Sequence, residues 1–355
     1  MVDALQHSIL QFLHVVHRAP RALGIEELAR TERVPDARTL YRWQRALADD
    51  LLYYPSITFR ALGLDHLHLV IDDPSSAWEE FPYAIRGEWV TRHPGQSTLY
   101  LHCLVPDEHR EDLLALLDDV RERGACANVT GIATSDGWQV MRDMTNDASE
   151  LESVPASVLR GSHSVWEVVE RVPLLIPVIF ETVEQRRNLP QVWREIYGRL
   201  GARVWEYLPR GATRKPNNGK ADVKDVYALL NHTGLFRQNI IRYQPLATSG
   251  ATMLLRLEGD ATKSITAFTK SASVLDLYPI SATEVLLRVE TTHAAAQRIM
   301  SATNNLPRII DWYFVDITRP RVQARFAYEL LFDPATTEWV FPREEILRRF
   351  TRGDP

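Results

Sequence analysis

The chain has 355 residues, of which 45% are hydrophobic and 25% are charged, and its mean hydropathy is −0.22, as in globular proteins. This length suits roughly two to four small domains. The formal net charge of −5 excludes a global polycation, so any contact with nucleic acid must come from local basic patches. The most apolar stretch, Val172 to Phe180, is too short to span a membrane and contains two prolines.

The N-terminus and the cysteines point to the same compartment. The opening residues, MVDALQHS, lack the basic-then-apolar shape of a signal peptide. Cys103 and Cys126 are the only cysteines, too few for a disulfide framework and without the spacing of a metal site. We therefore expect a cytoplasmic protein with no metal and no resident cofactor.

Two short helices joined by a tight turn are predicted between Ile25 and Asp50, after a longer helix from Asp3 to His17. Asp36 closes the turn and can cap the second short helix, because its carboxylate can accept a backbone N–H of the first helical turn. Three apolar residues of that helix recur at helical spacing and form one stripe: Leu40, Trp43 and Leu47. This arrangement is typical of a helix-turn-helix.

The opposite face of that helix is basic and polar. It carries Arg38, Thr39, Arg42 and Arg45, which are the predicted DNA-binding residues of the first copy. A helix anchored on one side can place such groups in a major groove, where guanidinium forks hold phosphates or guanine edges. Arginine-rich faces are also common on plain solvated surfaces. Leu51 to Leu64 favours the DNA interpretation, because its aromatic and β-branched residues predict a two-stranded wing that completes a winged helix-turn-helix over residues 1–60.

Residues 61–140 predict the element order βαββαβ of the ferredoxin-like fold. Strands are expected at Leu64–Val70, Glu88–Arg92, Ser97–Leu104 and Cys126–Ala133, and helices at Ser76–Ile85 and Asp107–Arg123. The longer helix is amphipathic, with its apolar residues expected inward: Leu113, Leu114, Leu117 and Val120. In the strand order 4-1-3-2 of that fold, the two cysteines lie on either side of the first strand, roughly 10 Å apart and too far for a disulfide.

The same series of elements then starts again. Residues 141–165 are polar, serine-rich and acidic, which predicts a linker. Residues 166–246 predict a second winged-helix-like domain, and residues 247–355 a second ferredoxin-like domain with a C-terminal extension. Because the order of elements agrees between the copies, we infer a tandem duplication. The expected fold class is α+β, with two winged helix-turn-helix domains alternating with two ferredoxin-like regulatory domains.

The second winged segment is the more basic one. It contains a loop, RGATRKPNNGK, whose Arg214, Lys215 and Lys220 are predicted to hold DNA phosphates, as is Lys224 on the following helix. The alternative is an ordinary solvated loop.

The order of these segments resembles the feast/famine (Lrp/AsnC-like) transcription regulators. The matching residues are Leu28, Ala29, Val34, Leu40, Arg42, Leu47, Leu51, Leu62 and Gly63, and the departures from the family pattern are Arg33, Pro35 and Asp50. The resemblance implies a regulator rather than an enzyme, which binds duplex DNA and often a small effector such as an amino acid. It also implies dimers built through the regulatory sheets.

The same fold order resembles siroheme decarboxylases, which is the enzyme alternative. His66 and His68 share one face of a predicted strand, and His102 lies on a neighbouring strand, where metal or porphyrin chemistry is conceivable. Histidines satisfied by hydrogen bonds in a core or at a surface are the commoner case. A scaffold in which the sheets only mediate oligomerisation is a third interpretation.

Two ferredoxin-like copies in one chain predict a homo-oligomer or an intrachain pseudo-dimer. A single four-stranded sheet has helices on one side only, so its other face needs a partner. In the second copy we expect that face to be apolar, through Leu255 and Leu257 or through Leu286 and Val289.

Overall fold

In a computed structural model of the chain, the described residues form two compact units, each assembled from two separate stretches of chain. The structure describes residues 29–30, 36–39, 42, 51–92, 96–135, 138–141, 162–185, 189–208, 225–226, 235–243, 250–258, 272–301, 308–320 and 322–351. The first unit comprises Met1–Ala61 and Arg142–Thr248, and the second comprises Leu62–Met141 and Ser249–Pro355. The chain is therefore a mixed α+β protein in which each unit takes one segment from each half of the sequence.

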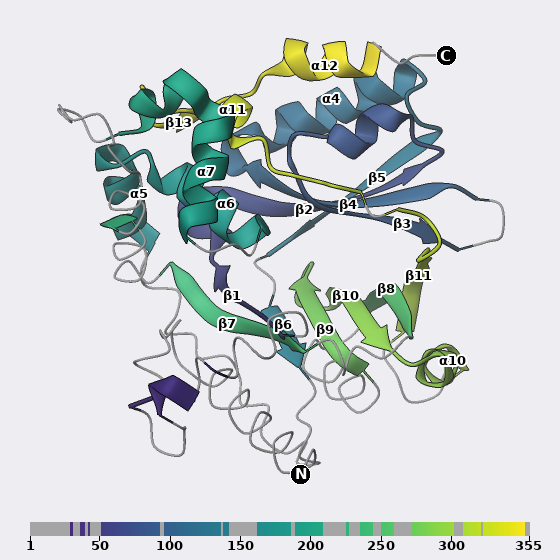
Figure 1. The fold of residues 1–355 in the computed structure, drawn as a ribbon. Helices are drawn as coiled ribbons and strands as arrows, with labels where there is room; N and C mark the ends of the chain where they lie inside the picture. The colour runs from purple at the N-terminus through teal and green to yellow at the C-terminus, as the bar shows by residue number, and fades with distance from the viewer. Residues whose placement is uncertain are drawn as a thin grey trace. The chain divides into compact units, whose positions relative to one another are not determined.

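The two predicted wings are single strands that pair with each other. Strand β1 (Leu51–Ile57) runs antiparallel to β7 (Phe236–Tyr243), from the pair Leu51 and Tyr243 onward, as Figure 1 shows. The prediction that Leu51 to Leu64 forms a two-stranded wing is wrong. A hairpin needs a reversing turn, and no Gly, Asn or Asp interrupts residues 51–57, so the chain runs straight through into the 3-10 turn η1 (Phe59–Leu62).

The first unit includes α5 (Ser162–Arg171), α6 (Leu175–Gln185) and α7 (Leu189–Leu200) of the second copy, followed by the 3-10 helix η5 (Gly201–Tyr207). Helix α5 begins within residues 141–165, the segment predicted as a linker. Val192, Ile196 and Leu200 recur at four-residue spacing on α7 and are buried. Arg199 of α7 forms an ion pair of 2.5 Å with Glu181, a buried carboxylate of α6.

The second unit is built on one sheet of nine antiparallel strands in the order β5-β2-β4-β3-β11-β8-β10-β9-β6. Its first half comprises β2 (Leu64–Asp72), β3 (Ala84–Thr91), β4 (Thr98–Pro106) and β5 (Asn128–Thr134), with the 3-10 helices η2 (Ser76–Glu80) and η3 (Asp107–His109) and the helix α4 (Arg110–Glu122). Its second half comprises β8 (Ala251–Glu258), β9 (Ala272–Pro279), β10 (Glu284–Thr291), helix α10 (His293–Ser301) and β11 (Arg308–Val315). In each half the fourth, first, third and second strands lie side by side in that order.

The two halves of this sheet exchange segments reciprocally. Strand β6 (Trp138–Met141), which follows the first half, pairs with β9 of the second half. In return Val322, which follows the second half, forms a bridge to Gly87 on β3 of the first half. Each half thus adds the segment after its fourth strand to the second strand of the other half.

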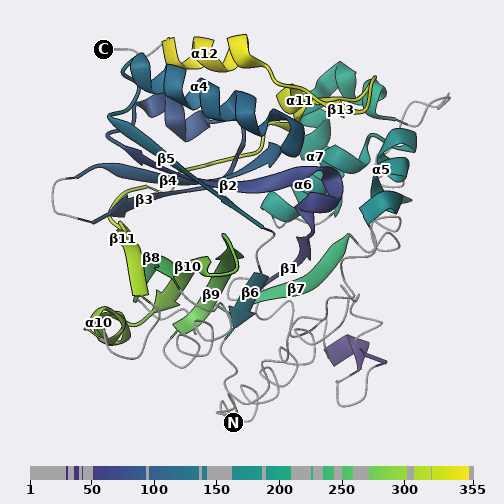
Figure 2. The ribbon, with the colours of Figure 1, turned by 180° about the vertical axis from the view of Figure 1, so that it is seen from behind.

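Helices cover the outer faces of both halves. In Figures 1 and 2, α4 and the C-terminal helix α12 (Arg343–Thr351) lie over β2–β5, and α10 lies over β8–β11. Between β11 and α12 the chain forms α11 (Tyr328–Leu331) and the short hairpin β12 (Phe332–Asp333) and β13 (Glu338–Trp339). The Trp339 indole N–H donates to the Leu62 carbonyl oxygen at 2.7 Å, which ties this extension to the start of β2. No described helix is long and apolar enough to cross a bilayer.

Two sequence predictions about apolar faces are wrong. On α4 the buried residues are Leu113, Leu116, Leu117 and Val120, whereas Leu114 is 43% exposed. Leu114 lies about 100° around the helix from Leu113, which turns it out of the buried stripe. In the second half of the sheet Leu255, Leu257 and Val289 pack on α10, so they belong to the helix-covered outer face. The inner face instead carries Leu254, which clusters with Val70, Val90 and Tyr100 of the first half. Leu286 lies on this inner face as predicted, since it lines a small cavity together with Val70 and Leu254.

Candidate functional site

Two places with side-chain hydrogen bonds stand out among the described residues, and the first is the start of the predicted recognition helix. The backbone N–H of Thr39 donates to Asp36 Oδ1 at 3.0 Å, which confirms the predicted cap. The Thr39 hydroxyl donates to Asp36 Oδ2 at 3.2 Å, and Arg42 donates in turn to Thr39 Oγ1 at 3.4 Å. The backbone N–H of Thr39 is the main reason that the pKa of Asp36 lies below its usual value.

The arginines near this cap face solvent. Arg38 and Arg42 are exposed and Thr39 is half-buried, so the described part of the predicted DNA-binding face is accessible. The other predicted contacts lie outside the described residues: Arg45, Arg214, Lys215, Lys220 and Lys224.

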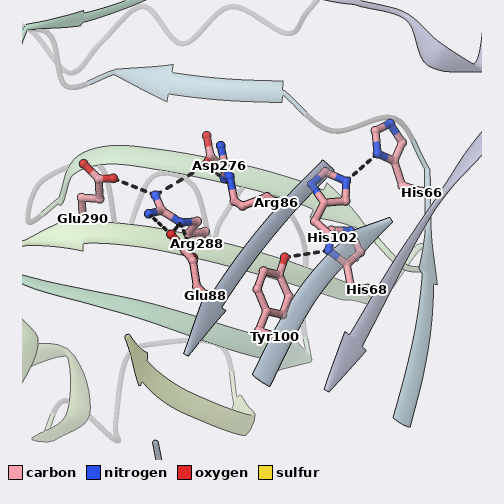
Figure 3. Close-up of polar contacts among 9 residues, drawn as sticks. All are labelled: His66, His68, Arg86, Glu88, Tyr100, His102, Asp276, Arg288 and Glu290. Atoms are coloured by element: carbon pink, nitrogen blue, oxygen red, sulfur yellow. Dashed lines mark hydrogen bonds and ion pairs between the residues drawn. The ribbon is translucent and has the colours of Figure 1, made fainter. Parts of the chain in front are cut away.

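The second place is a cluster of three buried histidines on the inner face of the nine-stranded sheet, drawn in Figure 3. His66 and His68 project from β2, and His102 lies on β4 directly across from His68. The rings of His68 and His102 stack at 4.4 Å between centroids. Tyr278, from β9 of the second half, lies within 6.0 Å of all three histidine rings, measured between centroids. We call His66, His68 and His102 the histidine cluster.

Hydrogen bonds satisfy this cluster. His66 Nδ1 and His102 Nε2 are 2.7 Å apart, so one of these nitrogens carries the proton and the other accepts it. His68 Nδ1 bonds to the Tyr100 hydroxyl at 2.7 Å, and its Nε2 bonds to Thr134 Oγ1 at 3.0 Å. The interpretation of the histidines as hydrogen-bonded core residues is therefore confirmed.

A second polar cluster lies beside the histidines (Figure 3). Its members, which we call the ion cluster, are Arg86 and Glu88 on β3, Asp276 on β9, and Arg288 and Glu290 on β10. Arg288 bonds to Glu88 and to Glu290 at 2.7 Å each, and Arg86 bonds to Asp276 at 3.1 Å. All but Arg86 have side chains no more than 13% exposed.

Burial and charge set the protonation of these groups. Burial lowers the pKa of His68 and of His102 well below the usual value for histidine, and the other histidines and Arg86 lower it further. Burial alone would raise the pKa of Glu88, but the charge and hydrogen bonds of Arg288 lower it below its usual value. His68 and His102 are thus held neutral next to a carboxylate held ionised.

Sequence reasoning identified the histidines but missed the ion cluster. A signal was present, because Arg86 and Glu88, like Arg288 and Glu290, alternate along their strands and therefore share one sheet face. Alternating charge normally indicates a solvated face, and only the pairing of the two halves buries these residues.

The described part of the inner face contains a small cavity. Among the described residues no group of three His, Cys, Asp or Glu side chains has the geometry of a metal site. The cavity nearest to Tyr100 measures about 20 Å³ and is lined by residues that include Val70, Leu254, Arg256 and Tyr313. This volume accommodates about one water molecule. Both cysteines are buried and free, and burial raises the pKa of the Cys103 thiol.

Comparisons of the chain with protein families, with curated proteins and with solved structures found no match.

Proposed function

We propose that the chain is a DNA-binding transcription regulator of the Lrp/AsnC-like type. Each copy would consist of a helix-turn-helix segment and a ferredoxin-like domain, and the two copies together would act as an intrachain pseudo-dimer. Duplex DNA is the partner, and the regulatory sheets are the place for any small effector.

The pairing of β1 with β7 is the observation that carries this proposal. These strands follow the two predicted helix-turn-helix segments and occupy the same place in each copy. When two equivalent strands pair antiparallel, a rotation of 180° about an axis between them exchanges the strands. The two strands are therefore related by a local twofold axis, as in a symmetric homodimer. The ladder runs from Leu51 and Tyr243 to Ile57 and Phe236, and Thr58 N–H extends it to the Leu235 carbonyl oxygen at 3.1 Å. A twofold arrangement is what a pair of half-sites on DNA requires.

The capped helix start supports a direct role in DNA contact. Asp36 holds the first turn through Thr39, and Arg42 is tethered to the same hydroxyl while its guanidinium stays exposed. A guanidinium that is already oriented loses less side-chain freedom when it meets a phosphate or a guanine edge.

The tetrapyrrole enzyme has weaker support. A large acidic substrate needs room and uncommitted basic groups, whereas Arg288 bonds to two carboxylates and the cavity nearest to Tyr100 holds about one water.

Selection of bound sequences from a random DNA pool tests the proposal with the full chain. Arg42→Ala should weaken binding to the selected sequence by about 1–3 kcal/mol, because it removes one oriented guanidinium. Arg121→Ala, an exposed arginine of α4, is the matched control and should leave binding unchanged. If the chain enriches no sequence, or if combined replacement of Arg38, Arg42 and Arg45 leaves affinity unaltered, the proposal fails.

A further inference from the structure

The histidine cluster lies where the two halves of the sheet meet face to face. His66 and His68 on β2 and His102 on β4 belong to the first half, and Tyr278 on β9 belongs to the second. The ring of Tyr278 is 4.6 Å from that of His68 and 5.0 Å from that of His102. A change in the charge of these rings therefore acts directly on the contact between the halves.

We propose that the histidine cluster is an acid-sensitive latch, which holds the halves of the nine-stranded sheet together when it is neutral and loosens them when it is protonated. This inference goes beyond DNA binding and does not depend on it.

The hydrogen bonds limit how many protons the cluster can accept. The bond between His66 Nδ1 and His102 Nε2 needs one nitrogen without a proton, so it survives one added proton and breaks when both rings are charged. The hydroxyls of Tyr100 and Thr134 can each accept from His68, so charging His68 keeps its hydrogen bonds. The cost of that charge then comes from burial and from the neighbouring rings.

Among the described residues, the charged groups on the strands around His68 and His102 are paired with one another. Tyr100 on β4 and Tyr278 on β9 contribute phenol rings, and burial raises the pKa of Tyr100 well above its usual value. Arg86 on β3 is the charged group that disfavours protonation of His68 and His102. The carboxylates of β3, β9 and β10 are Glu88, Asp276 and Glu290 of the ion cluster together with Glu284 of β10, and each lies within 4.0 Å of an arginine.

Lowering the pH should therefore first weaken the contact that β2 and β4 make with β9. An ordinary histidine titrates near pH 6.5, so at about pH 5.5 each histidine that protonates only in the opened form favours opening about tenfold. Above about pH 6.5 the cluster stays neutral and the two halves of the sheet stay in contact.

Hydrogen exchange of the full chain between pH 7.5 and 5.5, corrected for the intrinsic rate, measures this opening. We expect the amides of β9 and β2 to exchange at least about tenfold faster at pH 5.5, while amides of α6 stay unchanged. His66→Asn together with His102→Gln is the test variant, because these amides stand in for the bonded Nδ1 and Nε2 and do not titrate. It should lose most of the pH dependence, whereas His293→Asn, an exposed histidine of α10, should keep it.

Equal pH dependence in the wild type and the double variant overturns the latch. Should the double variant fail to fold, NMR titration of the wild-type histidines decides the matter. Protonation of all three rings near pH 6.5, with no change in exchange at β9, also overturns it.

Discussion

The outer and inner faces of the nine-stranded sheet are both buried, yet they are stabilised by different chemistry. On β10, Val285, Leu287 and Val289 face α10 in an apolar cluster, while Arg288 and Glu290 face the other half of the sheet. Neighbouring residues of one strand thus enter two cores, one apolar and one ionic. The difference teaches that an alternating polar pattern reports which face a residue occupies, and not whether that face meets water.

The largest effect should follow from removing the central cation of the inner face. Arg288→Met removes the cation that bonds to the buried carboxylates of Glu88 and Glu290, and it should lower the free energy of unfolding by about 3–5 kcal/mol. Urea denaturation of the full chain measures it. Arg308→Met, which breaks an exposed ion pair with Glu258, is the control and should cost less than about 1 kcal/mol. Equal losses in the two variants would mean that the inner face is solvated.

The next largest effect concerns the exchange of segments between the two halves of the nine-stranded sheet. A Cβ on Gly87 would approach Val322 Cβ to 2.7 Å, so Gly87→Ala should destabilise the chain by about 1–3 kcal/mol through overpacking. Gly131→Ala on β5 is matched, because its nearest contact would be an ordinary 3.5 Å to Leu67. Thermal melting of both variants measures the difference. Equal melting temperatures for Gly87→Ala and Gly131→Ala would mean that the bridge between Gly87 and Val322 does not stabilise the chain. If the contact limits packing, adding Val322→Ala to Gly87→Ala should restore part of the lost melting temperature.

A structural feature could be predicted from the sequence when the residues that form it lie close together in the chain. Most described strands and helices follow local patterns, and Asp36 caps its helix as predicted because a cap involves residues only three apart. The pairing of β1 with β7 and the burial of Arg288 depend on partners far away in the chain, such as Glu88. No period or motif within one segment specifies such a partner. The same reason placed Leu255 on the wrong face, since its strand alternates correctly and only the position of α10 assigns the sides.

The dependence of the unfolding free energy on acidic pH gives a further test of the buried ionic face, through Glu88. The folded-state pKa of Glu88 is lowered, so its stabilisation is complete above the unfolded value near 4.3 and is lost as the pH falls through the folded value. Over that window this one group contributes a slope of up to about 1.4 kcal/mol per pH unit. Glu88→Gln should therefore flatten the dependence of unfolding free energy on pH below about 4.3. Glu122→Gln, on the exposed end of α4, should leave the slope as in the wild type. A slope that is the same in both variants would show that Glu88 does not titrate with folding.

The smallest effect tests the boundary of the outer core. Leu114 is 43% exposed on α4, whereas Leu117, three residues further on, is 4% exposed. Leu114→Gln should change the free energy of unfolding by no more than about 0.5 kcal/mol, since surface substitutions rarely do more. Leu117→Ala should cost about 2–5 kcal/mol, because it removes buried methyl groups and leaves a cavity. Urea denaturation of the two variants compares adjacent turns of one helix, so intrinsic helix propensity contributes little to the difference. A loss at Leu114 as large as that at Leu117 would place Leu114 in the core, as its sequence pattern alone suggests, and would shift the buried stripe of α4 toward it.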